Sequence, residues 1–233
     1  MKKHLPNFLT LLNLASGSIG TILALKGDLI YGALFIRVGA CFDFLDGLVA
    51  RALGLSSPLG KQLDSLADLI TFGFLPTVIM YSLLELNTPS TELPYIALLI
   101  TLCAALRLAK FNIDAGQKHV FLGLSTTALG ILISTLPPII ANNHYPTISY
   151  LLTQPYTLVA LSVFGSVLLI TRIPFMAFKF NGYKWEANRI KYIFLLVGIC
   201  FVIIWRVEGI ALSMLMYIIL GSLLQKYADT KRD

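Results

Sequence analysis

The sequence has little charge for its length. Only 13% of the 233 residues are Asp, Glu, Lys or Arg, whereas 57% are hydrophobic, and an average soluble protein carries about a quarter charged residues. The mean hydropathy is +0.79. This balance argues against a soluble domain, because a membrane core of about 30 Å needs about 20 apolar residues for each helical crossing. We therefore expect residues 1–233 to form a single multi-pass transmembrane domain.

Cysteine and histidine are also scarce. Three of each occur, and their spacing fits neither a disulfide framework nor a zinc cluster. Cys41, Cys103 and Cys200 each lie inside an apolar stretch. We predict that all three are buried, unpaired side chains.

Apolar stretches predict an all-α membrane bundle of about eight transmembrane helices. A membrane-spanning chain must satisfy its backbone hydrogen bonds internally, and long stretches without alternating polarity indicate helices rather than a barrel. The expected spans lie near 7–25, 29–52, 63–84, 94–111, 121–142, 154–171, 190–205 and 208–225. The start of the sixth span is open, because residues 147–156 fit either an outer loop or part of the helix.

The positive charge is distributed over alternate gaps between these spans. The formal net charge is +6, and the intervening gaps contain little beyond Lys26 and Arg206. By the positive-inside rule, both termini and the basic loops face the cytoplasm at the cell membrane. Anionic lipid headgroups, not nucleic acid, are the expected partner. The basic gaps hold Lys2, Lys3, Arg51, Lys61, Arg107, Lys110, Lys118, residues 172–191, Lys226, Lys231 and Arg232.

Four of the twelve acidic residues lie between positions 43 and 68. Asp43 and Asp46 share one face of the expected 29–52 helix, and Asp64 and Asp68 share one face of the next helix. The two helices run antiparallel with a rise of about 1.5 Å per residue. We therefore predict two layers of carboxylates, Asp43 level with Asp68 and Asp46 level with Asp64 nearer the cytoplasm.

Carboxylates grouped in apolar surroundings are expected to bind cations. A structural ion-pair network is the alternative, but two nearby basic residues do not neutralise four acids in a low dielectric. All-oxygen ligation favours Mg²⁺ or Mn²⁺, with Ca²⁺ also compatible. Two such ions balance four carboxylates, neutralise a diphosphate and stabilise displacement at phosphorus.

Small residues accompany the aspartates. Gly47 and Ala50 lie on the acidic face of their helix and leave room for a nucleotide, and Gly60 permits a close helix crossing. Arg51, one turn beyond Gly47, either contacts phosphate or marks the cytoplasmic boundary. We expect these residues to form part of a substrate-binding site.

The eight residues of this stretch follow the pattern D-x2-D-G-x2-A-R-x8-G-x3-D-x3-D. This pattern resembles the signature of the CDP-alcohol phosphatidyltransferase family at every fixed position. The resemblance implies a membrane enzyme in which Asp43, Asp46, Asp64 and Asp68 bind metal and the CDP diphosphate. It also implies that Asp68 is the base that takes the acceptor's hydroxyl proton. Together with small-residue helix faces, it favours a homodimer.

Further segments resemble the membrane-embedded phosphatidylserine synthase subfamily. They are LPNFLTLLNLASG, LDSLADLITFGFLPT, LRLAKFN and RIPFMAFK. The resemblance implies transfer of the phosphatidyl group from CDP-diacylglycerol to L-serine by direct displacement, with release of CMP. A covalent route of the phospholipase D kind needs H-x-K pairs, which the sequence lacks.

Polar residues in these segments extend the predicted substrate site. Asn7, Thr10 and Asn13 line one stripe of the first helix and either contact cytidine or cap and pack that helix. Arg107 and Asn112 bind lipid phosphate or the serine carboxylate, or they only reflect the cytoplasmic charge bias.

Other functions fit parts of the pattern. Glycerol 3-phosphate or inositol phosphate as acceptor would use the same metal site, with several cationic side chains for its own phosphate. A membrane prenyltransferase also uses aspartates and magnesium, but in two motifs on distant helices. A cation transporter would move metal without releasing CMP, and it leaves Gly47, Ala50 and Arg51 without a role.

Arg37 is the unexplained charge. It falls in the middle of the second span, about 9 Å deeper than Asp43, where an unpaired guanidinium is costly. Asp43, Asp68 or a polar cavity is its expected partner.

Overall fold

The computed structural model describes residues 4–55, 57–113, 121–175 and 185–230. Its helices are α1 (Leu5–Leu25), α2 (Leu29–Ala52), α3 (Pro58–Asp68), α4 (Leu75–Asn87), α5 (Leu98–Ile113), α6 (Thr126–Ile133), α7 (Leu136–Asn142), α8 (Pro146–Thr153), α9 (Pro155–Ile170) and α10 (Trp185–Thr230). The all-α prediction is confirmed for these residues, apart from one short β pair. Of the residues used above, Lys2, Lys3, Lys118, Lys231, Arg232 and positions 176–184 lie outside the described ranges.

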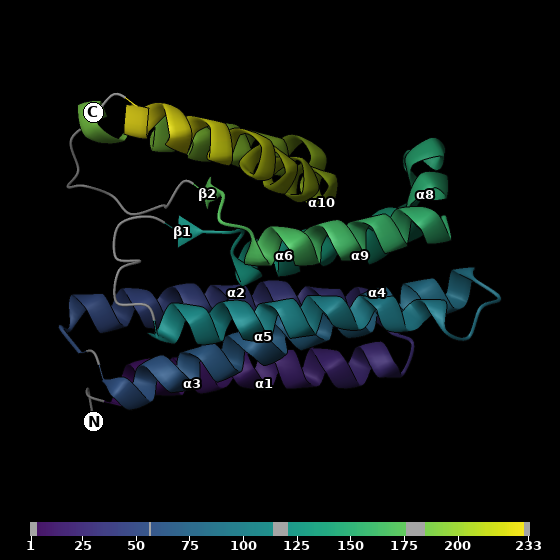
Figure 1. The fold of residues 1–233 in the computed structure, drawn as a ribbon, viewed down its shortest axis with the longest axis horizontal. Helices are drawn as coiled ribbons and strands as arrows, with labels where there is room; N and C mark the ends of the chain where they lie inside the picture. Colours follow the sequence, from purple (N-terminus) through teal and green to yellow (C-terminus); the bar gives the residue numbers. More distant parts are fainter. Residues whose placement is uncertain (1–3, 56, 114–120, 176–184, 231–233) are drawn as a thin grey trace.

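Two short helices and two strands complete the fold. A π-helical turn, η2 (Leu69–Phe74), joins α3 to α4, and a 3-10 helix, η3 (Leu93–Ala97), leads into α5. Strands β1 (Phe121–Leu122) and β2 (Pro174–Phe175) pair antiparallel. They lie between α10 and the α6/α9 layer (Figure 1).

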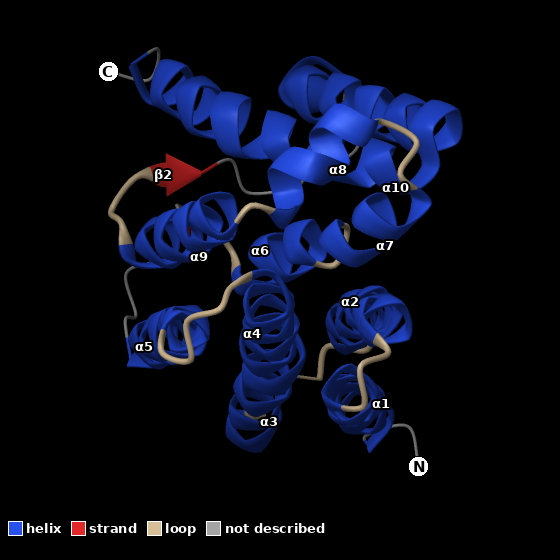
Figure 2. Cartoon of the chain, turned by 90° about the vertical axis from the view of Figure 1, so that its right-hand side faces the viewer, coloured by secondary structure: helices blue, strands red, loops and turns tan. Residues whose placement is uncertain are grey.

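The helices form layers with α4 in the middle. Figure 1 shows α1 to α5 along the long axis, α6 and α9 above them, and α10 on the far side. The end-on view places α4 between the α1/α2 pair and the α5/α9 pair (Figure 2). Accordingly, Leu75, Ile79, Met80 and Leu84 of α4 are completely buried. The core is thus centred on the helix that continues from α3.

Local sequence signals explain where these helices begin. The Asp28 side chain accepts a hydrogen bond from the Tyr31 N–H and caps α2, directly after a turn at Gly27 with φ +88°. Ser57 caps α3, because its hydroxyl accepts from the Gly60 N–H at 2.9 Å, and a proline follows it at the first helical position. Both are favoured helix starts.

The π-helical turn η2 begins immediately after Asp68. Pro76 near the start of α4 has no N–H, so the preceding turn loses one backbone donor and can widen. Thr71 of η2 is fully buried against α1, and its hydroxyl donates to the Asn13 carbonyl at 3.0 Å. The hydrogen bond from Thr71 in this widened turn therefore attaches the end of α3 to α1.

Gly17 makes this contact possible and yields a stability prediction. A Cβ atom at Gly17 would lie 2.7 Å from the Thr71 Cα, so the backbone of α1 or of η2 would have to shift. We expect Gly17→Ala to destabilise the protein by about 1–3 kcal/mol, measured as a lower unfolding temperature in detergent. Ser18→Ala, on the exposed side of α1, is the matched control; an unchanged midpoint for Gly17→Ala would contradict this packing.

Helix α10 is folded back on itself. Arg206 has non-helical backbone angles, φ 50° and ψ −114°, and the Ser213 hydroxyl on the second half reaches the Gly198 carbonyl of the first half at 3.3 Å. The two halves therefore lie side by side, as both views show (Figures 1 and 2). Their break falls between the predicted spans 190–205 and 208–225.

Four helical segments of the described residues are long and apolar enough to cross a membrane, or five if the bent α8–α9 pair is one span. These are Leu5–Leu25, Pro58–Asn87, Leu93–Ile113 and Lys191–Gly221. Helix α2 has 24 residues and is long enough as well, but it carries four charged side chains, Arg37, Asp43, Asp46 and Arg51. Helices α6 and α7 form a shorter apolar segment, Thr126–Asn142.

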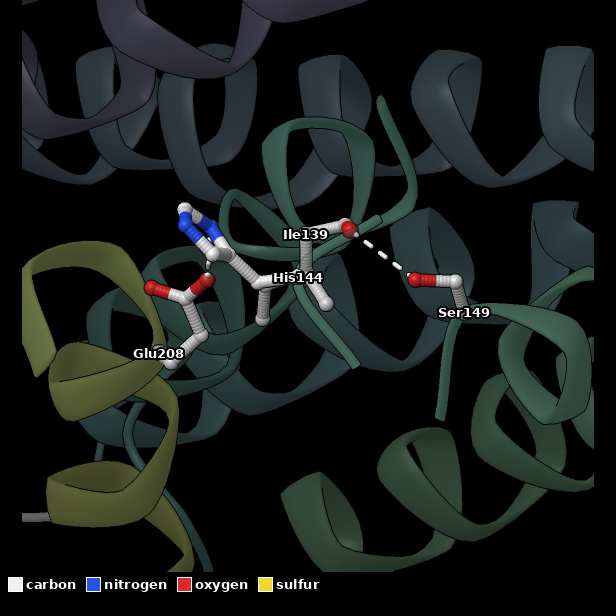
Figure 3. A network of polar contacts seen from close by, with 4 residues as sticks. All are labelled: Ile139, His144, Ser149 and Glu208. Carbon is white, nitrogen blue, oxygen red and sulfur yellow. Dashed lines mark hydrogen bonds and ion pairs between the residues drawn. The ribbon is translucent and has the colours of Figure 1, made fainter. Parts of the chain in front are cut away.

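The end of the bundle farthest from the chain termini is formed by α7, α8 and the α10 bend. Helix α8 is separate from α9 and meets it at 73°, so residues 147–156 are neither loop nor straight helix. The Ser149 hydroxyl donates to the Ile139 carbonyl at 3.2 Å, and His144 lies 3.9 Å from Glu208 (Figure 3). The first contact attaches α8 to α7, and the second attaches the second half of α10 to the turn between α7 and α8.

The prediction for the cysteines was partly wrong. All three are unpaired, but Cys41 and Cys200 are exposed and Cys103 is only partly buried. In a membrane-embedded bundle, the surface that contacts lipid is as apolar as the core. Hydropathy alone therefore cannot distinguish a buried from a lipid-facing cysteine.

Candidate active site

Three carboxylates from two helices meet beside the core. One oxygen each of Asp43 on α2 and of Asp64 and Asp68 on α3 lie within 4.8 Å of one another, and all three residues are partly buried. We call these residues the three-carboxylate cluster. An arrangement of this size is suited to ligate a hard divalent cation.

Asp46 lies at the edge of this cluster. It is 7% exposed, and its Oδ2 accepts a hydrogen bond of 2.6 Å from the Thr10 hydroxyl on α1. The two-layer prediction is thus only partly right: Asp43 does lie beside Asp68, but Asp64 joins them in one group. Asp46 is instead oriented by Thr10 of α1. The predicted layers were derived from the rise per residue along α2 and α3 and did not take α1 into account.

Asp68 also has a partner on α1. The Asn13 side chain is completely buried, and its Nδ2 donates to Asp68 Oδ1 at 3.3 Å. Since Thr71 also binds the Asn13 backbone, α1 holds α3 and η2 at the position of Asp68. One oxygen of that carboxylate is occupied by Asn13, which leaves the other for a ligand.

A cavity of about 400 Å³ opens next to Asp46 and Asp64. We call it the acidic cavity. Most of the residues predicted to bind substrate line it, namely Asn7, Thr10, Gly47, Ala50 and Gly60. A Cβ atom on Gly60 would lie 3.1 Å from both Asn7 Oδ1 and Ser57 Oγ, so this glycine lets α3 approach α1. Arg51 is not among the lining residues, although its guanidinium lies over Gly47.

A second cavity of about 550 Å³ contains basic side chains. Arg107 and Lys110 of α5 and Arg172 after α9 line it, together with apolar residues. We call it the basic cavity. Asn112, which the sequence grouped with Arg107, is not among the described residues that line either cavity; its side chain binds α3 instead.

Among the described residues, no basic side chain forms an ion pair with the carboxylates, although Arg107 is close enough to Asp68, and Arg51 to Asp46, to interact through their charges. The described residues form an ion pair within 4 Å between His144 and Glu208, which lie far from the cluster. Arg37 is partly buried, and its Nε has no hydrogen-bond partner in the described part of the chain, so the expected pairing with Asp43 or Asp68 is not seen there. Two arginines at this distance do not balance four carboxylates, and the remaining negative charge suits a bound cation.

The family model described as CDP-alcohol phosphatidyltransferase matches residues 3–167. This range includes α1 to α5, all four aspartates and both helices of the three-carboxylate cluster. The chain belongs to the CDP-alcohol phosphatidyltransferase family. The expectation drawn from the aspartate spacing is therefore confirmed at the level of the family.

Several curated members of the CDP-alcohol phosphatidyltransferase family are similar to this chain. CDP-diacylglycerol–serine O-phosphatidyltransferase of Bacillus subtilis is 34% identical over 155 residues, which cover 65% of this chain and 87% of that protein. Archaetidylserine synthase of Methanothermobacter thermautotrophicus is 35% identical over 56% of each chain. The Helicobacter pylori (strain 26695) CDP-diacylglycerol–serine O-phosphatidyltransferase is 28% identical over 93% of this chain and 88% of that protein.

Some residues of this family member's site were not assigned a role from sequence. These are Pro6, Leu55, Ser57 and Lys61, which also line the acidic cavity. Asn13, for which the sequence left cytidine contact and helix packing open, contacts Asp68. The stripe of Asn7, Thr10 and Asn13 was a usable signal for α1. The spacing of these three residues does not indicate which side chain each of them contacts on a neighbouring helix.

Proposed function

We propose that this enzyme transfers the phosphatidyl group from CDP-diacylglycerol to L-serine, giving phosphatidylserine and CMP. The observation that carries the proposal is the three-carboxylate cluster beside a cavity of nucleotide size, in a chain whose relatives are named for serine. The Bacillus relative is aligned over 87% of its length. The match therefore extends over most of that enzyme.

The donor set fits one or two divalent ions, Mg²⁺ or Mn²⁺ in preference to Ca²⁺. Asp43, Asp64 and Asp68 offer oxygens within 4.8 Å of one another, and Asp46 borders the adjacent cavity. Bound metal supplies positive charge that neutralises the diphosphate and the departing CMP. Zinc is disfavoured, because histidine and thiolate ligands are absent from the cluster.

The remaining chemistry falls to the side chains. Asp68 accepts the proton of the serine hydroxyl, whose oxygen forms the new bond to the phosphatidyl phosphorus as the bond from that phosphorus to CMP breaks. Asn13 holds one Asp68 oxygen at 3.3 Å, so the carboxylate keeps one orientation. Thr10 does the same for Asp46.

The nucleotide occupies the acidic cavity in this proposal. Gly47, Ala50 and Gly60 leave space along α2 and α3, and Asn7 and Thr10 offer polar atoms from α1. Arg51 lies at the rim over Gly47, where it can reach a phosphate oxygen. The acceptor or the lipid phosphate is bound on the side of Arg107, in the basic cavity.

A phosphorylated acceptor is the second candidate. Three cationic side chains share the basic cavity, which is the feature expected for glycerol 3-phosphate or inositol phosphate. The names of the relatives favour serine, whose carboxylate suits the same cations.

An acceptor panel tests the proposal. Purified protein receives labelled CDP-diacylglycerol with L-serine, glycerol 3-phosphate or inositol phosphate in turn, and the lipid product is identified. We expect phosphatidylserine with serine, and CMP release at least about 100-fold slower with the other two, because a site built for one acceptor's polar groups rejects analogues strongly. If the main product were instead the lipid formed from glycerol 3-phosphate or from inositol phosphate, that compound and not serine would be the acceptor.

The topology is part of the same proposal. We propose one domain over residues 1–233 with eight crossings, both termini and the active site on the cytoplasmic side, and a homodimer. The basic gaps support the orientation, and the break at Arg206 supports two crossings in α10. Gly17 and Gly130 are used in packing within the chain, so support for the dimer comes from the family resemblance.

A further inference from the structure

Helix α3 carries two of the three clustered carboxylates but buries few of its side chains. Of its eleven residues only Ala67 is buried, whereas α4, which continues from it, lies in the core. Its first turn borders the acidic cavity through Gly60 and Lys61. With so little apolar burial, the position of α3 depends on polar contacts with its neighbours.

Besides the bond from Asn13 of α1 to Asp68, the polar contacts of α3 are made with the end of α5. The Asn112 Nδ2 donates to Ser65 Oγ at 2.9 Å and to Gln62 Oε1 at 3.3 Å. In return, the Lys61 ammonium donates to the Asn112 carbonyl at 3.1 Å and lies 5.7 Å from the centre of the Phe111 ring, within cation–π range. We call these five residues the α3–α5 clasp.

We propose that Asn112 is a positioning residue: through the α3–α5 clasp it holds α3 where Asp64 and Asp68 meet Asp43. This inference rests on the proposed metal-assisted transfer and replaces direct substrate contact as the role of Asn112. Ser65 follows Asp64 directly in the chain and lies one turn before Asp68. A displacement of α3 at Ser65 therefore moves both carboxylates away from Asp43, which is fixed on α2.

The alternative is that Asn112 binds substrate through its own Oδ1. That atom is buried and has no hydrogen-bond partner in the described residues, so a ligand contact is a real competitor. The two roles differ in what they change. Loss of positioning lowers metal affinity, whereas loss of a substrate contact raises the KM for that substrate.

The test is a double-mutant cycle on the full-length enzyme. Asn112→Ala, Ser65→Ala and the double variant are compared for the Kd of Mn²⁺, measured by electron paramagnetic resonance without substrates, and for the Mn²⁺ concentration at half-maximal rate, kcat and the KM of serine. We expect Asn112→Ala to raise the half-saturating Mn²⁺ about 10-fold, with excess Mn²⁺ restoring most of kcat and the serine KM within about 2-fold. The double variant should match Asn112→Ala, because both changes break the same contact.

Two further measurements keep the result decisive. Leu66→Ala, also on α3 but 59% exposed, is the control and should behave like the wild type. If Asn112→Ala does not fold, Ser65→Ala alone should still raise the half-saturating Mn²⁺ about 3-fold, since the Gln62 contact remains. Additive effects in the cycle, or a higher serine KM at unchanged metal demand, would overturn the inference. Wild-type turnover with serine in the same assay tests the proposed function separately.

Discussion

Replacing Asp68 by asparagine is expected to lower turnover with CDP-diacylglycerol and serine by about three orders of magnitude. The two side chains have the same shape, and an asparagine oxygen still accepts the hydrogen bond that Asn13 donates to Asp68 Oδ1. The amide, however, takes no proton from the serine hydroxyl and carries no charge for a metal. The measurement is CMP release in mixed micelles under saturating substrates.

Two comparisons show which function of Asp68 is lost. The unfolding temperature of Asp68→Asn should stay close to that of the wild type, because the contact to α1 remains. Raising the Mn²⁺ concentration should not restore the rate, since the missing group is the proton acceptor. Near-normal turnover by Asp68→Asn would show that another group is the base.

Removal of divalent metal should stop the reaction completely. A chelator is expected to reduce CMP release by at least about 1,000-fold, because metal charge at a phosphoryl centre is worth several kcal/mol. Added Mg²⁺ or Mn²⁺ should restore it. The physical reason is the cluster itself, in which oxygens of Asp43, Asp64 and Asp68 lie within 4.8 Å of one another and, among the described residues, form no ion pair with a cationic side chain.

A ligand variant refines the same prediction. Asp43→Asn should raise the half-saturating Mn²⁺ about 10- to 100-fold and should respond to excess metal, unlike Asp68→Asn. Asp28→Asn is the control, because Asp28 caps α2 at its other end. Full activity in the metal-free protein would remove the basis for a metal site. Metal flux into vesicles without CMP release would indicate a transporter.

The spacing of the aspartates proved more informative than hydropathy. The pattern from Asp43 to Asp68 identified the family, which the match over residues 3–167 confirms. Hydropathy located the helices but not the membrane crossings: α2 contains the charges of the site, so composition alone excludes it as a span. Of these charges, Asp46 is buried and Asp43 is partly buried inside the bundle, whereas Arg51 is exposed at the helix end.

Sequence by itself determined which residues share a helical face, because that depends only on the rise and turn of one helix. It therefore predicted Asp43 with Asp46 and Asp64 with Asp68, and most of the lining of the acidic cavity. The distances between helices were decided by tertiary structure. The π-helical turn after Asp68, the glycine contact of α1 with Thr71 and the Asn112 contact with α3 fix those distances. As a result, Asp64 lies with Asp43 and Asp68, and Asp46 accepts a hydrogen bond from Thr10. Sequence could not predict this, because packing between helices depends on side chains far apart in the chain.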